Sequence, residues 1–146
     1  MAGFLLDGMI GIVDCMTVRA KTLSITIRCA PEKVYAYASN PLNLPHWAPA
    51  FCLSVHKVNE DWIIQSPAGP MKVRFVEPNP YGILDHTVTV MADVEVFVPM
   101  RVFSNGNGSE VVFTIFQEPY RSDTEFAQDV GMVERDLQTL KKRMEA

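Results

Sequence analysis

Alternation of apolar and polar positions is the clearest signal in this chain, and it first appears at residues 23–28. Apolar side chains (Leu23, Ile25, Ile27) alternate there with polar ones (Ser24, Thr26, Arg28). A period of two places one face of a strand against a core and the other in water. Pro31 then suits a first helical position, where no N–H is needed, so a short helix is predicted from it. Pro41 and Pro45 end that helical region.

The same alternation continues downstream between short turns. It predicts strands near residues 51–56, 62–66, 71–75, 84–90, 94–103 and 110–117. The run Asn105-Gly106-Asn107-Gly108 separates the last two and is typical of a hairpin, because Asn and Gly tolerate positive φ. Short connections between successive strands favour an antiparallel sheet with sequential neighbours.

The C-terminal pattern changes to the period of a helix. Ser122 and Glu125 form a capping-box signature at its start. One apolar stripe follows at steps of four and three (Phe126, Val130, Val133, Leu137, Leu140, Met144). Such a stripe must be buried, and the concave face of the sheet is the available surface.

Composition fits a single domain without a nucleic-acid partner. The chain has 146 residues, of which 48% are hydrophobic, and a net charge of −4. Its one basic block, Lys141-Lys142-Arg143, lies at the predicted end of the last helix, where cations complement the helix dipole. No apolar run reaches the roughly 18 residues of a membrane span, which argues against stable membrane insertion.

The N-terminus is treated as an extension, residues 1–16, ahead of one domain at 17–146. Its apolar stretches are interrupted by Asp7 and Asp14 and have no basic residues before them, which argues against a signal peptide. It could be an upstream translation artefact, an extra strand, or a segment that packs on a partner subunit. The three cysteines and three histidines lack metal-ligand spacing, so reduced thiols, a cytoplasmic location and no metal or cofactor are expected.

Residues 18–144 resemble a known superfamily. The resemblance is carried by the strand-to-helix run Cys29–Trp47, by Leu84-Asp85-His86, by Pro99-Met100-Arg101 and by the Asn-Gly-Asn-Gly-Ser-Glu-Val-Val-Phe-Thr run from Asn105. These are similar to the START-like, polyketide cyclase/dehydrase and lipid-transport (SRPBCC) superfamily, in a bacterial branch. The resemblance implies an α+β helix-grip fold: a curved antiparallel sheet wrapped around a long C-terminal helix, with two short helices after the first strand.

His86 is the main candidate for chemistry. It is the one ionisable residue on an otherwise apolar strand face, so it should point toward the last helix and any cavity. A neutral core histidine with a satisfied ring and a ligand-binding or acid–base histidine both fit this position. Asp85 cannot orient it, because successive strand residues point to opposite faces. Arg101 is expected to pair with an acid such as Glu110, or to hold a ligand carboxylate.

Large apolar side chains supply a candidate lining. Core packing explains any one of them, but together they suit a curved sheet that leaves volume for a ligand. The candidate ligand-binding residues are Trp47, Phe51, Trp62, Met71, Phe75, His86, Met100, Phe113, Phe126 and Met132.

Two functions follow from these expectations. The first is binding of a hydrophobic or aromatic small molecule, such as a lipid or polyketide, in a cavity between the sheet and the C-terminal helix. The alternative is a polyketide cyclase or dehydratase in which His86, with Arg101, moves protons. The sequence leaves open whether a reaction is catalysed and whether the protein is a homodimer.

Overall fold

The computed structural model of the chain describes residues 15–146, so most of the predicted N-terminal extension lies outside the described residues. The elements, in chain order, are β1 (Ala20–Ile27), α1 (Pro31–Ala38), the 3-10 helix η2 (Pro41–Asn43), α2 (Leu44–Trp47), β2 (Ser54–Val58), β3 (Asp61–Ser66), β4 (Gly69–Phe75), β5 (His86–Met91), β6 (Val94–Val98), β7 (Met100–Asn105), β8 (Gly108–Phe116) and α3 (Asp123–Glu145). Pro31 opens α1 as predicted, since its fixed φ suits a first helical position. The prediction that Pro41 and Pro45 end the helical region is wrong, because each lies in the first positions of a further short helix, η2 or α2.

The strands form two antiparallel sheets that share one interior. One sheet has the order β2-β3-β4-β5-β6 and the other the order β1-β8-β7. The single strand predicted for residues 94–103 is wrong, because it divides at Pro99 into β6 and β7, which belong to different sheets. Proline has no N–H to donate to a ladder, so the chain changes sheets there.

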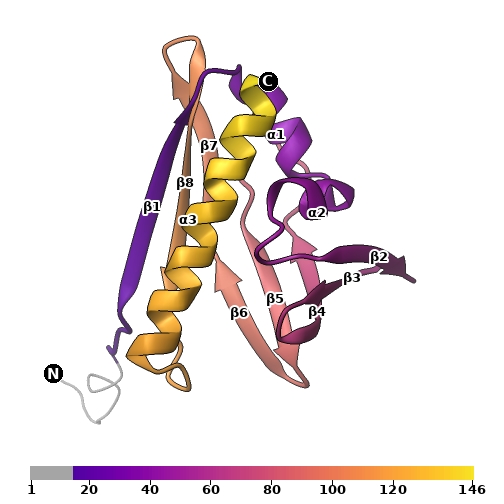
Figure 1. Cartoon of the computed structure of the whole chain (residues 1–146), viewed down its shortest axis with the longest axis vertical. Coiled ribbons are helices and arrows are strands. Elements are labelled where there is room, and N and C mark those ends of the chain that lie inside the picture. Colours follow the sequence, from indigo (N-terminus) through magenta and orange to yellow (C-terminus); the bar gives the residue numbers. More distant parts are fainter. Residues whose placement is uncertain (1–14) are drawn as a thin grey trace, which may run out of the picture.

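Helix α3 lies across the sheets, as the apolar stripe predicted (Figure 1). Its first turn carries the predicted capping box, in which Ser122 Oγ accepts from Glu125 N–H and the Glu125 carboxylate accepts from Ser122 N–H. Phe126, Leu137 and Leu140 of the stripe are buried. The predicted α+β fold, with antiparallel sheets, two early short helices and a long terminal helix, is therefore confirmed.

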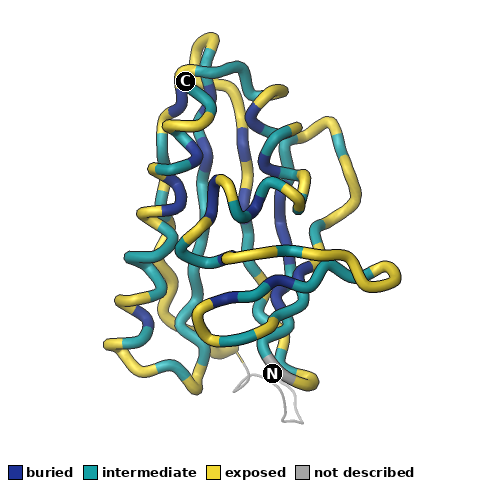
Figure 2. Tube along the Cα trace, turned by 45° about the vertical axis from the view of Figure 1, so that its right-hand side comes forward, coloured by how far each residue is buried: buried dark blue, intermediate teal, exposed yellow. Residues whose placement is uncertain are grey.

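Burial is uneven along α3. Leu137 and Leu140, in its C-terminal half, join the main core with residues of α1, α2 and both sheets, whereas Val130 and Val133 are only half-buried. Phe126, near the start of the helix, is buried as well, and Figure 2 shows buried segments toward both ends of α3. The concave face of the sheet is therefore closed at the α1–α2 end and less completely covered along the part of α3 that carries Val130 and Val133. No helix within residues 15–146 is both long and apolar enough to cross a membrane.

Candidate functional site

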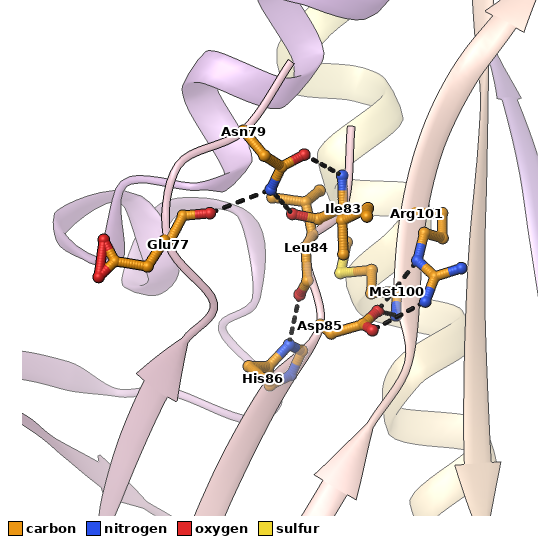
Figure 3. A network of polar contacts seen from close by, with 8 residues as sticks. All are labelled: Glu77, Asn79, Ile83, Leu84, Asp85, His86, Met100 and Arg101. Carbon is orange, nitrogen blue, oxygen red and sulfur yellow. Dashed lines mark hydrogen bonds and ion pairs between the residues drawn. The ribbon is translucent and has the colours of Figure 1, made fainter. Parts of the chain in front are cut away.

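The loop between β4 and β5 fixes the residues that precede His86. Asn79 organises this loop, since its side-chain Nδ2 donates to the carbonyls of Glu77 and Ile83, each at 3.0 Å. Its Oδ1 accepts from the N–H groups of Tyr81 and Ile83, also at 3.0 Å. The Asn79 N–H donates to the Tyr35 hydroxyl at 2.9 Å, which ties the loop to α1. These contacts set the backbone path into β5 (Figure 3).

The end of the same loop is held against β7. Val102 N–H donates to the Gly82 carbonyl at 2.9 Å, and Leu84 N–H donates to the Met100 carbonyl at 2.8 Å. Gly82 has φ of +72°, and a Cβ there would overlap the Val102 carbonyl oxygen. The close approach between the two sheets therefore depends on glycine at this position.

His86 opens β5 and points into the interior. Its side chain is 8% exposed, and its ring lies against two aromatic rings, with centroids 4.9 Å from Phe75 and 5.9 Å from Phe113. Burial lowers its pKa, although the Leu84 carbonyl and Asp85 act in the opposite direction. The imidazole is therefore neutral near pH 7, because its unperturbed pKa is only about 6.5.

The hydrogen bond to Leu84 decides the tautomer. His86 Nδ1 lies 2.9 Å from the Leu84 carbonyl oxygen, which can only accept, so Nδ1 carries the proton. In the neutral ring Nε2 is then an acceptor, and within residues 15–146 it forms no hydrogen bond. In the same part of the chain the one enclosed side-chain nitrogen or oxygen without a partner is Trp47 Nε1.

Asp85 and Arg101 form a separate pair on the opposite face of the strand. Asp85 Oδ1 accepts from Met100 N–H at 2.9 Å, and the Arg101 guanidinium donates Nε and one terminal N–H to the two carboxylate oxygens at 3.2 and 2.8 Å. Burial alone would raise the pKa of Asp85, but these hydrogen bonds outweigh it and the pKa is lowered. As expected, Asp85 does not contact the His86 ring by hydrogen bond (Figure 3).

The expected pairing of Arg101 with Glu110 is wrong. Arg101 lies opposite Val112 in the ladder, while Glu110 lies opposite Phe103 and accepts from Thr26 and Asn105. The bridge between Ile83 and Arg101 instead brings Asp85 beside the guanidinium. The structure therefore does not bring Arg101 to His86, and its donors are occupied outside the interior.

The predicted apolar lining separates into three groups. Met71, Phe75, Phe113 and Phe51 are half-buried and pack against the core, and Phe75 and Phe113 lie against the His86 ring. Trp47 and Met100 are almost fully enclosed in the core. The remaining three lie elsewhere: Phe126 is beneath the Arg19 guanidinium, Trp62 is beneath Lys57, and Met132 is half-buried on α3 outside the main core.

A groove of about 250 Å³ leads toward His86 from the α1–η2 end of the sheet. Its lining includes Phe75, whose ring lies against the His86 ring, and Leu84, whose carbonyl accepts from His86 Nδ1. Its lining residues are Tyr35, Ser39, Pro41, Glu60, Asp61, Trp62, Val73, Arg74, Phe75, Val76, Pro78, Ile83 and Leu84. A second hollow of about 410 Å³ lies between the β1–α1 turn and the β7–β8 hairpin, away from the candidate residues. Neither hollow is lined by α3, unlike the predicted cavity.

Asp136 was missed by the sequence reasoning. It lies on α3 within the apolar stripe, three residues after Val133 and four before Leu140, and is 5% exposed. Its oxygens accept from the N–H groups of Ala50 and Phe51 at 2.9 and 3.2 Å. It thus holds the α2–β2 connection against the helix. An acidic residue at a stripe position was the available signal.

Asp136 should make stability fall as pH rises from about 4 to 6. Burial raises its pKa from 3.8 to about 6, against the two backbone hydrogen bonds. The folded state then binds this proton more tightly than the unfolded state, so the contribution is favourable below the unfolded pKa and lost through the folded one. Asp136→Asn should remove this contribution to the pH dependence of stability. Urea unfolding midpoints at pH 4, 5, 6 and 7 measure that dependence.

At each pH the urea midpoint of a variant is subtracted from that of the native protein. This difference cancels the effect of the other carboxylates, which titrate in both proteins. Glu134→Gln, on the exposed side of the same helix, is the matched control and should leave the slope intact. Equal pH slopes in native protein and Asp136→Asn would show that Asp136 is not desolvated as described.

Comparison with known proteins agrees with this architecture. A family model described as polyketide cyclase / dehydrase and lipid transport matches residues 20–145. No curated protein sequence matches the chain.

Solved structures include XoxI from Bacillus cereus, with TM-score 0.69 and 19% identity over 88% of this chain and 96% of that chain. The Aha1 dimer from Colwellia psychrerythraea has TM-score 0.70 and 16% identity over 87% and 96%. DynU16, described as a protein in the dynemicin biosynthetic locus, has TM-score 0.67 and 12% identity over 87% of this chain and 47% of that one. At these identities the likeness shows a shared fold.

Proposed function

Because this chain belongs to the polyketide cyclase / dehydrase and lipid transport family, we propose that it binds a hydrophobic or aromatic small molecule between the sheet and α3. The molecule would lie on the concave face around His86, Phe75 and Phe113, with the groove beside Trp62 as its path from solvent. A lipid, a polyketide or a similar metabolite fits this description.

One observation carries the proposal: large apolar side chains that face one another across the interior remain partly accessible. Met71, Phe75, Val90 and Phe113 on the sheets and Val133 on α3 are all half-buried. Protein interiors normally pack at the density of organic crystals and leave such side chains enclosed. Apolar surface that stays accessible on a concave face favours an apolar ligand, whose binding removes that surface from water.

Diphenylhexatriene, an uncharged hydrocarbon that fluoresces in apolar surroundings, tests this proposal. We expect about one probe per chain, with a change in Trp62 emission because its indole lines the groove. His86→Phe keeps the bulk and apolarity of the site. Its affinity for the probe should therefore stay within about tenfold of the native affinity, a difference in binding free energy of about 1.4 kcal/mol. His56→Phe, at an exposed histidine on β2, is the control. A native protein that binds no probe contradicts the proposal.

A catalytic role is the second candidate, and His86 Nε2 favours it. A neutral imidazole with a free lone pair at the interior can accept a proton from a substrate, as a cyclase or dehydratase acting on a poly-β-keto chain requires. We leave Arg101 out of this second candidate, because its guanidinium donates to Asp85 on the other face. Turnover of such a substrate should then fall roughly a hundredfold in His86→Phe while diphenylhexatriene binding persists.

Location and assembly are proposals of the same kind. Cys15, Cys29 and Cys52 are free thiols, which supports a cytoplasmic location. A homodimer is supported by the similar fold of the Colwellia Aha1 protein, which is described as a dimer. Cell fractionation and sedimentation of the full chain test these two proposals.

A further inference from the structure

The buried polar groups around the proposed ligand site lack a cation. Within residues 15–146, the buried polar or charged residues are Ser66, Asp85, His86, Ser109 and Asp136. None is Lys or Arg. The Arg101 guanidinium donates two hydrogen bonds to the Asp85 carboxylate on the outer face. Lys141 and Arg143 of α3 donate to the main-chain carbonyls of Thr26 and His46 on exposed parts of the surface.

A carboxylate ligand would therefore enter this interior without a counter-charge. Removing an ionised carboxylate from water costs several kcal/mol unless a cation or several donors receive it. Asp136 makes the cost larger, because its own carboxyl group is buried on the α3 side of the same core. The interior consequently disfavours fatty acids and other anions.

His86 offers a hydrogen-bond acceptor, which suits an uncharged donor and not a carboxylate. Its Nδ1 proton is committed to the Leu84 carbonyl, so the free Nε2 can only accept while the ring is neutral. Within residues 15–146, the one acid that raises the pKa of the ring is Asp85, which points to the other side and pairs with Arg101. A ligand that covers Nε2 without donating to it would leave a buried acceptor unpaired, whereas a ligand that donates a hydrogen bond to Nε2 avoids that cost.

A second polar group of the core, the Trp47 indole N–H, lacks a partner within the described part of the chain. Its side chain is 4% exposed, and its Nε1–H is enclosed without an acceptor among residues 15–146. Trp47 and Leu84, the residue that fixes the His86 tautomer, belong to the same core cluster. An oxygen brought into this core could accept from the indole, whereas a hydrocarbon would leave it unpaired.

We propose that the ligand is an uncharged apolar molecule bearing a hydroxyl group, alcoholic or phenolic, which donates its hydrogen bond to His86 Nε2. The inference deepens the proposed function and rests on it, because it specifies which hydrophobic molecules the site accepts. It excludes fatty acids and other carboxylates as preferred ligands.

Three naphthalene derivatives of similar size separate the possibilities: 2-naphthol, 2-methoxynaphthalene and 2-naphthoate. Dissociation constants are measured at pH 7 by calorimetry for the native protein, His86→Phe and His56→Phe. For each protein, the affinity for 2-naphthol is divided by the affinity for 2-methoxynaphthalene. The ratio of the native protein is then divided by the ratio of the variant, which cancels the different hydrophobicity of the two compounds. We expect this quotient to be about ten for His86→Phe and about one for His56→Phe. In the native protein 2-naphthoate should bind at least roughly a hundredfold more weakly than 2-naphthol.

The outcomes separate the inference from the proposed function. If the derivatives bind but the quotient for His86→Phe is one, or if 2-naphthoate matches 2-naphthol, the hydroxyl preference is overturned while hydrophobic binding stands. If none of the three binds, and diphenylhexatriene does not bind either, both proposals fail together.

A measurement on the native protein covers the case in which His86→Phe does not fold. The ¹⁵N resonances of the His86 ring should show a neutral Nδ1–H tautomer, and Nε2 should shift when 2-naphthol is added. Addition of 2-methoxynaphthalene should leave that Nε2 resonance near its starting position. An Nε2 resonance that responds equally to both compounds would overturn the proposed hydrogen bond.

Discussion

Leu137→Asp is expected to unfold the domain. Leu137 is 3% exposed in the main core, where α3 meets α2 and both sheets. Truncating a buried leucine to alanine already costs about 2–5 kcal/mol, and a carboxylate adds the cost of burying a charge without a partner. The total is comparable with the whole stability of a typical domain, about 5–15 kcal/mol. Circular dichroism and urea unfolding measure the loss directly.

Gln138→Asp is the matched control for this change. It introduces the same side chain one position along α3 on the exposed side, so helix propensity, net charge and dipole effects are nearly equal. We expect it to keep the native fold with a change of about 1 kcal/mol or less. Comparable stability in the two variants would show that the sheet does not grip α3 through Leu137.

Gly82→Ala should cost the protein at least about 3 kcal/mol. A residue other than glycine at φ of +72° bears a backbone strain of about 1–2 kcal/mol. The added Cβ would also overlap the Val102 carbonyl oxygen, forcing the loop away from β7. Because Leu84, Asp85 and His86 follow directly, diphenylhexatriene affinity should fall as well. Urea unfolding and probe titration measure both effects.

Gly106→Ala separates backbone strain from steric overlap. Gly106, in the β7–β8 hairpin, has φ of +59°, but no atom lies near the position of an added Cβ. Only the strain applies there, so a loss of about 1–2 kcal/mol and unchanged probe binding are expected. Equal losses in the two variants would rule out a tight contact between Gly82 and β7.

The candidate site could be predicted only in part from the chain. The inward position of His86 and its separation from Asp85 follow from the alternation of strand side chains, and both hold in the structure. The partner of Arg101 could not be predicted, because Asp85 reaches it through the bridge between Ile83 and Arg101. That contact joins segments of different sheets, for which local periodicity carries no information.

Asp136 shows the same limit on a helix. Periodicity locates Asp136 within the buried stripe of α3. The reason for an acid at this position is that its carboxylate accepts hydrogen bonds from the N–H groups of Ala50 and Phe51. Those donors come from a connection more than eighty residues away in the chain.

Local signals predicted four features of this fold: the start of α1 at Pro31, the Ser122–Glu125 capping box, the Asn-Gly hairpin and the stripe through Leu137 and Leu140. Each depends on neighbouring residues, whose spacing is fixed by covalent geometry and backbone hydrogen bonding. Tertiary packing alone decided that Pro99 divides one apolar run between two sheets, that Arg101 faces outward, and that His86 retains a free Nε2. Those outcomes depend on which distant backbone groups meet, because a buried polar atom takes whatever partner the fold brings to it.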